Sequence, residues 1–200
     1  MRRSHVLTLS VMLVGASACE SGGAGPITAE EYAVYSALLD SMYSDTPYVR
    51  LVVYESTQSV VPPPEPAEGE VPEPGPVEGL AAMQRVPRSL LREFKRTNSL
   101  SYPLAADSFR TRLDVTLLQQ ADHDSILGEP RDNWQEFYDR FPNAGGFIVL
   151  TRVAFSRDGR RALLNVDLYC GWLCGAGHGA MLEKRRGRWI VAQHDMWWVS

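Results

Sequence analysis

The sequence predicts an α+β fold, in which short N-terminal and mid-chain helices pack on a mostly antiparallel sheet that ends in a C-terminal β-meander. Segments with helical periodicity and capping residues come first, and segments that alternate apolar and polar residues fill the end of the chain. Such a run of helices followed by a run of strands is typical of α+β domains. A chain of 200 residues with 44% hydrophobic content is long enough for one core.

The N-terminus predicts export. Arg2 and Arg3 form a positive region, residues 6–14 are mostly apolar, and small residues at 16–18 precede Cys19. This arrangement predicts a signal peptide over residues 1–18, since its apolar centre is too short to cross a membrane as a mature helix.

The segment from Leu13 to Cys19 resembles the lipobox of bacterial lipoproteins. In that family the cysteine is acylated on sulfur and becomes the new N-terminus. The resemblance implies a lipidated Cys19, a flexible tether over residues 19–26 and attachment to the cell envelope. By resemblance to the sorting pattern of these lipoproteins, Glu20 after the cysteine argues against retention in the inner membrane, so we expect the periplasmic side of the outer membrane. The alternative is ordinary cleavage after Ala18, which yields a secreted soluble protein.

Residues 27–200 are expected to form a single α+β domain that carries an insertion at about 57–86. Between Val61 and Gly79 the chain has seven prolines and five glutamates. This composition cannot bury enough apolar surface to offset the entropy of ordering, so we expect the insertion to be disordered.

Three helices are expected before the meander. Thr28 and Glu31 form a capping box at the start of the first, which should end near Ser44 before Pro47. Pro87 starts the second helix, which extends to Arg96. Asp132 is the expected N-cap of the third, with Gln135 as its reciprocal partner. An aromatic stripe on this third helix indicates a core face: Trp134, Phe137, Tyr138 and Phe141.

Alternation predicts strands at 48–54, 112–118, 147–155, 161–169, 179–184 and 188–199. Asp158-Gly159 and Arg186-Gly187 mark hairpin turns between the later strands. Element order alone suggests a cystatin-like or nuclear-transport-factor-like cone, in which a helix packs into a curved sheet. Because Trp197 and Trp198 are adjacent on a strand, we expect them to point to opposite faces and one of them to be exposed. The Asp122-His123-Asp124 triplet is interpreted as a solvated loop.

The region from Trp134 to Gly179 resembles uncharacterised bacterial exported proteins that combine a Trp-x-x-Phe-Tyr helix and a Pro-x-x-x-Gly turn with a Cys-Gly-x-x-Cys-Gly-x-Gly segment. The matching residues are Trp134, Phe137, Tyr138, Pro142, Gly146, Cys170, Gly171, Cys174, Gly175 and Gly177. The resemblance implies a continuous fold over this third of the chain and implies no mechanism.

Four interpretations of Cys170 and Cys174 compete. If Cys19 carries lipid, the other two cysteines form an even pair in an oxidising compartment, which favours a disulfide across a glycine-rich bend. A zinc site would add His178 and His194, but the Cys-x3-Cys spacing disfavours it. The remaining interpretations are thiol redox chemistry and a Cys174 nucleophile with His178 or His194 as base and Asp167 or Asp195 as orienting group.

These observations predict a lipid-anchored envelope protein that serves as a binding or interaction module rather than an enzyme. Its expected partners are the membrane, through the anchor, and either a protein or a small ligand. After removal of Arg2 and Arg3, 18 of the 20 basic residues remain, against 24 acidic residues. This excess of acidic residues does not favour nucleic-acid binding. No cofactor or metal is expected. The alternatives are a thiol-dependent or other hydrolase that uses Cys174 and His178, and a structural component of envelope assembly.

Overall fold

The computed structural model describes residues 25–61, 75–128 and 132–200. Its helices are α1 (Ala29–Met42), α2 (Pro76–Ala82), α3 (Arg88–Thr97), a short 3-10 helix (Ala106–Ser108), α4 (Gln120–Ile126) and α5 (Trp134–Arg140). Its strands are β1 (Arg50–Tyr54), β2 (Asp114–Leu118), β3 (Ala144–Leu150), β4 (Ala154–Phe155), β5 (Arg161–Gly171), β6 (Cys174–Arg185) and β7 (Arg188–Val199). The predicted signal peptide, Cys19 and the centre of the Pro/Glu-rich insertion lie outside the described residues.

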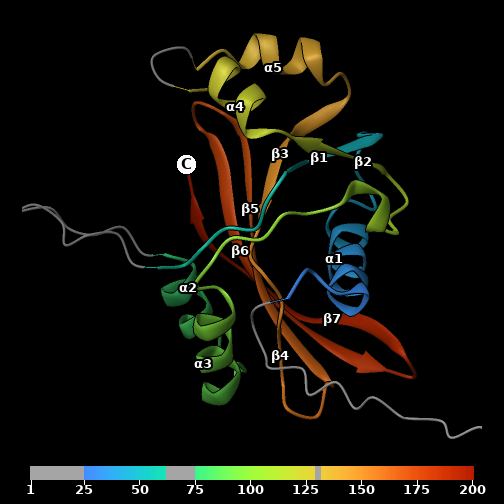
Figure 1. The fold of residues 1–200 in the computed structure, drawn as a ribbon, viewed down its shortest axis with the longest axis vertical. Helices are drawn as coiled ribbons and strands as arrows, with labels where there is room; N and C mark the ends of the chain where they lie inside the picture. The colour runs from blue at the N-terminus through green and yellow to red at the C-terminus, as the bar shows by residue number, and fades with distance from the viewer. Residues whose placement is uncertain (1–24, 62–74, 129–131) are drawn as a thin grey trace, which may run out of the picture.

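One mixed, mostly antiparallel sheet organises the chain, which confirms the predicted fold class. Its strand order is β2-β1-β3-β5-β6-β7, and β4 pairs with β5 off this path. The C-terminal strands β5, β6 and β7 form the expected meander (Figure 1). The β1 strand pairs in parallel with both β2 and β3, an arrangement that the sequence did not predict.

Helix α1 packs against one face of the sheet. Thr28 and Glu31 form the predicted capping box, and the buried side chains Tyr32, Tyr35 and Leu39 lie on one stripe of the helix. Their partners are apolar residues of β1, β3, β5 and β6, which alternate along these strands. This cluster is the main core of the protein.

A buried ion pair joins the start of α1 to the chain between β3 and β4. Arg152 Nε donates to Glu31 Oε1 at 2.8 Å, and the two side chains are 7% and 3% exposed. The same guanidinium donates to the Gly25 carbonyl at 2.9 Å. Glu31 therefore serves both the helix cap and the anchoring of the chain that enters α1.

Two helix pairs cover separate parts of the opposite sheet face. Phe137 of α5 and Ile126 of α4 pack on β1, β2 and β3 at one end. Leu90 and Phe94 of α3, with Leu80 of α2, pack on β4, β5 and β6 farther along. Figure 1 shows α4 and α5 at the top of the molecule and α2 and α3 at lower left.

Helix α2 corrects the predicted extent of the disordered insertion. Residues 57–61 and 75–86 of the predicted segment are described, and residues 76–82 among them form this helix. Leu80 is fully buried and Met83 is nearly so. Pro76 provides a helix start, and the apolar residues beyond it find a surface on β6, which composition alone could not show.

Other local expectations need smaller corrections. Asn133, rather than Asp132, caps α5, since its side chain accepts a hydrogen bond from the Glu136 amide. The Asp122-His123-Asp124 triplet lies within α4 and is not a loop. The predicted strand 147–155 is divided into β3 and β4, because the Arg152 amide between them donates to the Asn98 side chain at 2.6 Å instead of to the neighbouring strand.

The prediction for Trp197 and Trp198 is wrong. A β-bulge in β7 pairs Gly177 with Trp198 but His178 with Met196, which leaves one extra residue between them. Both indoles therefore reach the face that carries α2 and α3. Trp197 Nε1 donates to Asn165 Oδ1 at 2.7 Å, and Trp198 Nε1 donates to Asp167 Oδ1 at 3.2 Å. The highly exposed tryptophan is Trp172, which is 76% exposed.

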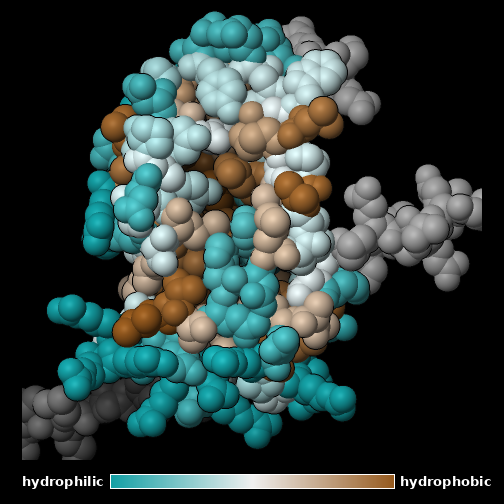
Figure 2. All heavy atoms as spheres, turned by 180° about the vertical axis from the view of Figure 1, so that it is seen from behind, coloured by the Kyte–Doolittle hydropathy of each residue, from teal (hydrophilic) through white to brown (hydrophobic). Residues whose placement is uncertain are grey.

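The arginines of the meander lie mainly at one end of the molecule. The turns at 156–161 and 183–188 carry most of the arginines of the meander. Figure 2 shows the reverse side of the molecule, where hydrophilic residues cover the lower end and apolar residues gather in the middle. The other end of the β5–β6 hairpin carries exposed Trp172 and Leu173 instead.

Candidate functional site

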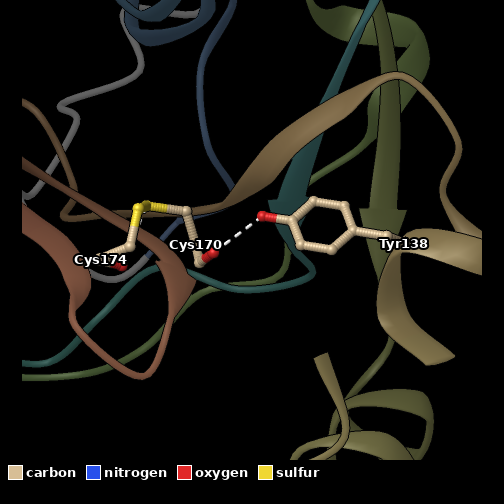
Figure 3. Close-up of a disulfide and its surroundings, with 3 residues drawn as sticks. All are labelled: Tyr138, Cys170 and Cys174. Atoms are coloured by element: carbon tan, nitrogen blue, oxygen red, sulfur yellow. Dashed lines mark hydrogen bonds between the residues drawn. A yellow bond between two sulfur atoms is a disulfide. The ribbon is translucent and has the colours of Figure 1, made fainter. Parts of the chain in front are cut away.

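Cys170 and Cys174 form a disulfide that closes the turn between β5 and β6, as predicted. Their Cα atoms are 5.0 Å apart. Tyr138 of α5 donates its hydroxyl to the Cys170 carbonyl at 2.8 Å, which fastens the stapled turn to the helix (Figure 3). The turn is thus fixed within the hairpin by the disulfide and to α5 by the Tyr138 hydrogen bond.

The cysteine-based alternatives are not assembled in this geometry. The Cys174 sulfur is bonded to Cys170 and provides no thiolate. His178 lies four residues farther along the same strand, a separation of about 13 Å, which is far beyond a hydrogen bond or a metal–ligand bond. Among the described residues, no group of three or more His, Cys, Asp and Glu side chains could hold a metal ion.

Asp167 and His178 point to opposite faces of the sheet. Asp167 pairs with Gly177, whereas His178 pairs with Val166, so their side chains alternate across β5 and β6. Asp167 is buried and accepts hydrogen bonds from Asn165 and Trp198, and burial raises the pKa of its carboxyl. It is therefore a buried structural acceptor and cannot orient His178.

His178 and His194 stack on the face that carries α1. Their ring centroids are 4.7 Å apart. Burial, and for His178 also the neighbouring imidazole, lowers the pKa of both rings, which favours the neutral forms. His178 Nδ1 is buried and has no hydrogen-bond partner among the described residues. The two histidines thus lie together, but apart from both Asp167 and the disulfide.

Gly175 and Gly177 serve packing rather than turn geometry. Glycines in a tight bend often provide positive φ angles, but of the glycines in this bend only Gly171 has one, at 155°. A Cβ at Gly177 would overlap the Trp198 indole, and a Cβ at Gly175 would lie 2.9 Å from the same ring. The small residues on β6 make room for Trp198.

A cavity lined by aromatic side chains lies on the sheet face opposite α1, between α4, α5 and the strands beneath them. We call it the aromatic cavity, and its volume is about 470 Å³. Its lining is Tyr54, His123, Trp134, Phe147 and Tyr169, with Leu127 and Val149, and a polar side formed by Ser56, Thr57, Gln58, Ser59, Ser101 and Asp132.

The aromatic rings of the cavity form a continuous array. Phe147 lies nearly parallel to Trp134 on one side and to Tyr169 on the other, with interplanar angles of 14° and 20°. His123 stands perpendicular to both Tyr54 and Phe147. Burial raises the pKa of Tyr169 to about 12, so its hydroxyl stays protonated at neutral pH.

A second, more open hollow, which we call the outer hollow, adjoins the cavity. It has a volume of about 630 Å³ and lies between the start of α5 and the stapled turn. Trp172 lines it from the turn, and residues 132–136 line it from α5. Asp132 and Trp134 border both spaces, so the two are adjacent, and together we call them the aromatic groove.

Sequence reasoning did not find the aromatic cavity. Its residues come from β1, the segment after β1, α4, α5, β3 and β5, and no spacing in the sequence links them. Two signals were present but were interpreted otherwise. His123 belongs to the acidic triplet, and Trp134 belongs to the stripe assigned to the core, of which Phe137 is the fully buried member.

In comparisons with protein-family models, curated proteins and solved structures, none matches this chain. Within the ranges that the structure describes, every helix is too short or too polar to span a bilayer.

Proposed function

We propose that the protein is a lipid-anchored component of the bacterial cell envelope, on the periplasmic side of the outer membrane, and that it binds a small ligand in the aromatic cavity. The export signal and the lipobox-like segment that ends at Cys19 support the location. The observation that carries the binding role is the cavity itself, because ligand sites are concave, mostly apolar and fitted with a few polar groups.

The size of the cavity suits this role. Small-molecule sites usually enclose about 300–1,000 Å³, and the aromatic cavity, at about 470 Å³, falls within that range. Its aromatic side chains offer large apolar contact area, while hydroxyl and amide groups on the opposite side can fix a ligand's orientation.

The surroundings of the cavity are preorganised. Phe147 and Tyr169 are cross-strand partners in β3 and β5, so the backbone ladder sets their positions. Ser101 donates to the Thr57 carbonyl, and Thr57 Oγ1 accepts from the Tyr102 amide at 3.0 Å, which fixes the polar wall. A rigid wall limits the entropy lost when a ligand binds.

Filling the cavity tests the binding role. The full-length mature protein would be titrated with soluble oligosaccharides, short peptides and short-chain acyl compounds, with intrinsic tryptophan fluorescence as the readout. We expect one class to saturate the wild type and to lose at least tenfold in affinity in Val149→Trp, which places an indole in the cavity. Ile190→Trp adds the same side chain at an exposed site on β7 and should not change affinity. Failure of all three classes, or equal binding by Val149→Trp, would contradict the role.

The anchor is tested separately by Cys19→Ser. If Cys19 carries lipid, the variant should move from the membrane fraction to the soluble fraction, because acyl chains provide the attachment. Unchanged fractionation would refute the anchor without bearing on the cavity.

A further inference from the structure

We propose that the ligand is an oligosaccharide that lies along the aromatic groove, from Tyr169 past Trp134 to Trp172. This inference rests on the proposed binding function and adds the chemical class and the extended shape of the ligand. It also assigns a role to the disulfide-stapled turn.

The shape of the groove favours an extended ligand. Because the aromatic cavity and the outer hollow share Asp132 and Trp134, a molecule that fills the first can continue into the second without leaving the surface. The outer hollow is shallow and ends at Trp172, which is 76% exposed. A compact ligand would use the cavity alone and would leave Trp172 in water.

The chemistry of the lining matches the two kinds of surface on a sugar ring. Pyranose rings carry apolar C–H faces and a rim of hydroxyls, and aromatic side chains with nearby polar groups complement both. Trp134, Phe147 and Tyr169 provide the aromatic surfaces. Ser56 and Asp132 provide hydroxyl and carboxylate groups on the polar side of the cavity.

Gln58 offers a ligand of this kind a specific hydrogen-bond acceptor. Its side-chain oxygen is buried and has no hydrogen-bond partner among the described residues, although Gln58 lines the cavity. A buried acceptor without a donor costs free energy, so a ligand that brings a hydroxyl or an amide N–H to this atom gains from pairing it. Sugar hydroxyls are such donors, whereas an acyl chain has none.

The disulfide gives the outer end of the groove its rigidity. Trp172 lies between Cys170 and Cys174 in the turn, and Tyr138 bonds the turn to α5, the helix that carries Trp134. The staple therefore holds Trp172 on one side of the outer hollow while the start of α5 lines the other. A free turn would lose conformational entropy on binding, and the disulfide removes most of that cost beforehand.

The chain enters the fold far from this turn. Glu30, at the start of α1, bonds Lys184 Nζ at 2.6 Å and Trp189 Nε1 at 2.8 Å. Lys184 is ten residues from Cys174 along β6, a separation of about 34 Å. Figure 1 shows the start of α1 in the lower half of the molecule and the β5–β6 turn near the top. Residues 19–25 could span only about 20 Å even when fully extended. The groove therefore lies near the end of the sheet that is farther from the chain's entry point, and from the lipid anchor that we propose at Cys19.

The test measures how affinity depends on chain length. Calorimetric titration of the full-length mature protein would use N-acetylglucosamine, its dimer and its tetramer, and the matching glucose series linked β-1,4. We expect one series to bind, with affinity rising at least tenfold from monomer to tetramer. Trp172→Ala should remove that gain and leave the monomer's affinity unchanged. Leu173→Ala is the matched control, because Leu173 is an exposed neighbour on the same turn that lines neither hollow.

Two outcomes would overturn the inference. One is the absence of binding by both sugar series, and the other is tetramer affinity that is insensitive to Trp172→Ala. If sugars fail while a peptide or an acyl compound still binds the wild type and not Val149→Trp, the ligand class is wrong and the cavity remains a binding site. If nothing binds, both proposals fail together.

Discussion

Replacement of Gly177 by alanine should destabilise the protein through its effect on Trp198. The added Cβ would overlap the indole Nε1 and Cδ1 atoms and would lie 2.6 Å from Asp167 Oδ1. Backbone strain is not the cause, because Gly177 does not have a positive φ. The ring must therefore move away from the sheet, and its hydrogen bond to Asp167 must break.

The size of the effect follows from these two contributions. Overpacking in a well-packed region costs about 1–3 kcal/mol. Loss of the indole N–H from a buried carboxylate acceptor adds about 1–3 kcal/mol. Gly177→Ala should thus lower the free energy of unfolding by about 2–6 kcal/mol in total. Gly175→Ala should cost less, since its nearest contacts, Ser200 Oγ and the outer edge of the indole, are at 2.9 Å and can shift outward.

Urea unfolding monitored by circular dichroism would measure both variants, and a double-mutant cycle would identify the cause. In a Trp198→Ala background, Gly177→Ala should cost no more than about 1 kcal/mol, because the overlapping ring is gone. A loss below 1 kcal/mol in the wild-type background, or an equal loss in both backgrounds, would refute the reasoning.

Three further predictions concern the staple, a buried carboxyl and a buried ion pair. Replacement of both Cys170 and Cys174 by serine should lower stability by about 2 kcal/mol, the loop entropy for a separation of four residues; calorimetry on oxidised and reduced protein checks this. Asp167→Asn should flatten the dependence of stability on pH above about pH 4, measured by urea unfolding. Its raised pKa means that the folded state retains the proton while the unfolded chain releases it, so wild-type stability falls as pH rises. Arg152→Met should cost about 3–5 kcal/mol, because Glu31 is left as an unpaired buried charge, and a second change, Glu31→Gln, should restore part of this.

Each of these predictions has a clear contrary result. Identical calorimetric traces for oxidised and reduced protein would show that the staple does not stabilise the fold. Parallel pH profiles for wild type and Asp167→Asn would show that this carboxyl does not titrate differently on folding. If Glu31→Gln worsened Arg152→Met instead of relieving it, the cost would come from packing of the arginine and not from the unpaired charge.

The sequence predicted best the features that depend on neighbours along the chain. The capping box of Thr28 and Glu31 needs residues only three apart, and the Arg186-Gly187 turn needs positive φ at adjacent positions, where the structure has 51° and 79°. The pairing of Cys170 with Cys174 followed from cysteine count and compartment, because the two residues are too close along the chain to have many other arrangements.

Expectations failed where distant segments meet. Alternation predicted opposite faces for Trp197 and Trp198, but their hydrogen bonds to Asn165 and Asp167 of β5 accompany a bulge that places both on one face. Composition suggested disorder through residue 86, but a surface on β6 accepts Leu80. These outcomes depend on the partner strand, which the local sequence does not contain.

The sequence by itself determined the α+β class, the first helix, the late hairpins and the stapled turn, because short-range spacing and capping chemistry specify them. Only the tertiary structure decided that His123, Trp134, Phe147 and Tyr169 surround one cavity, and that Trp172 stands beside it. The reason is physical: a cavity is the space left between packed elements. Its lining therefore depends on the parallel pairing of β1 and the position of α5 on the sheet, which no local pattern records.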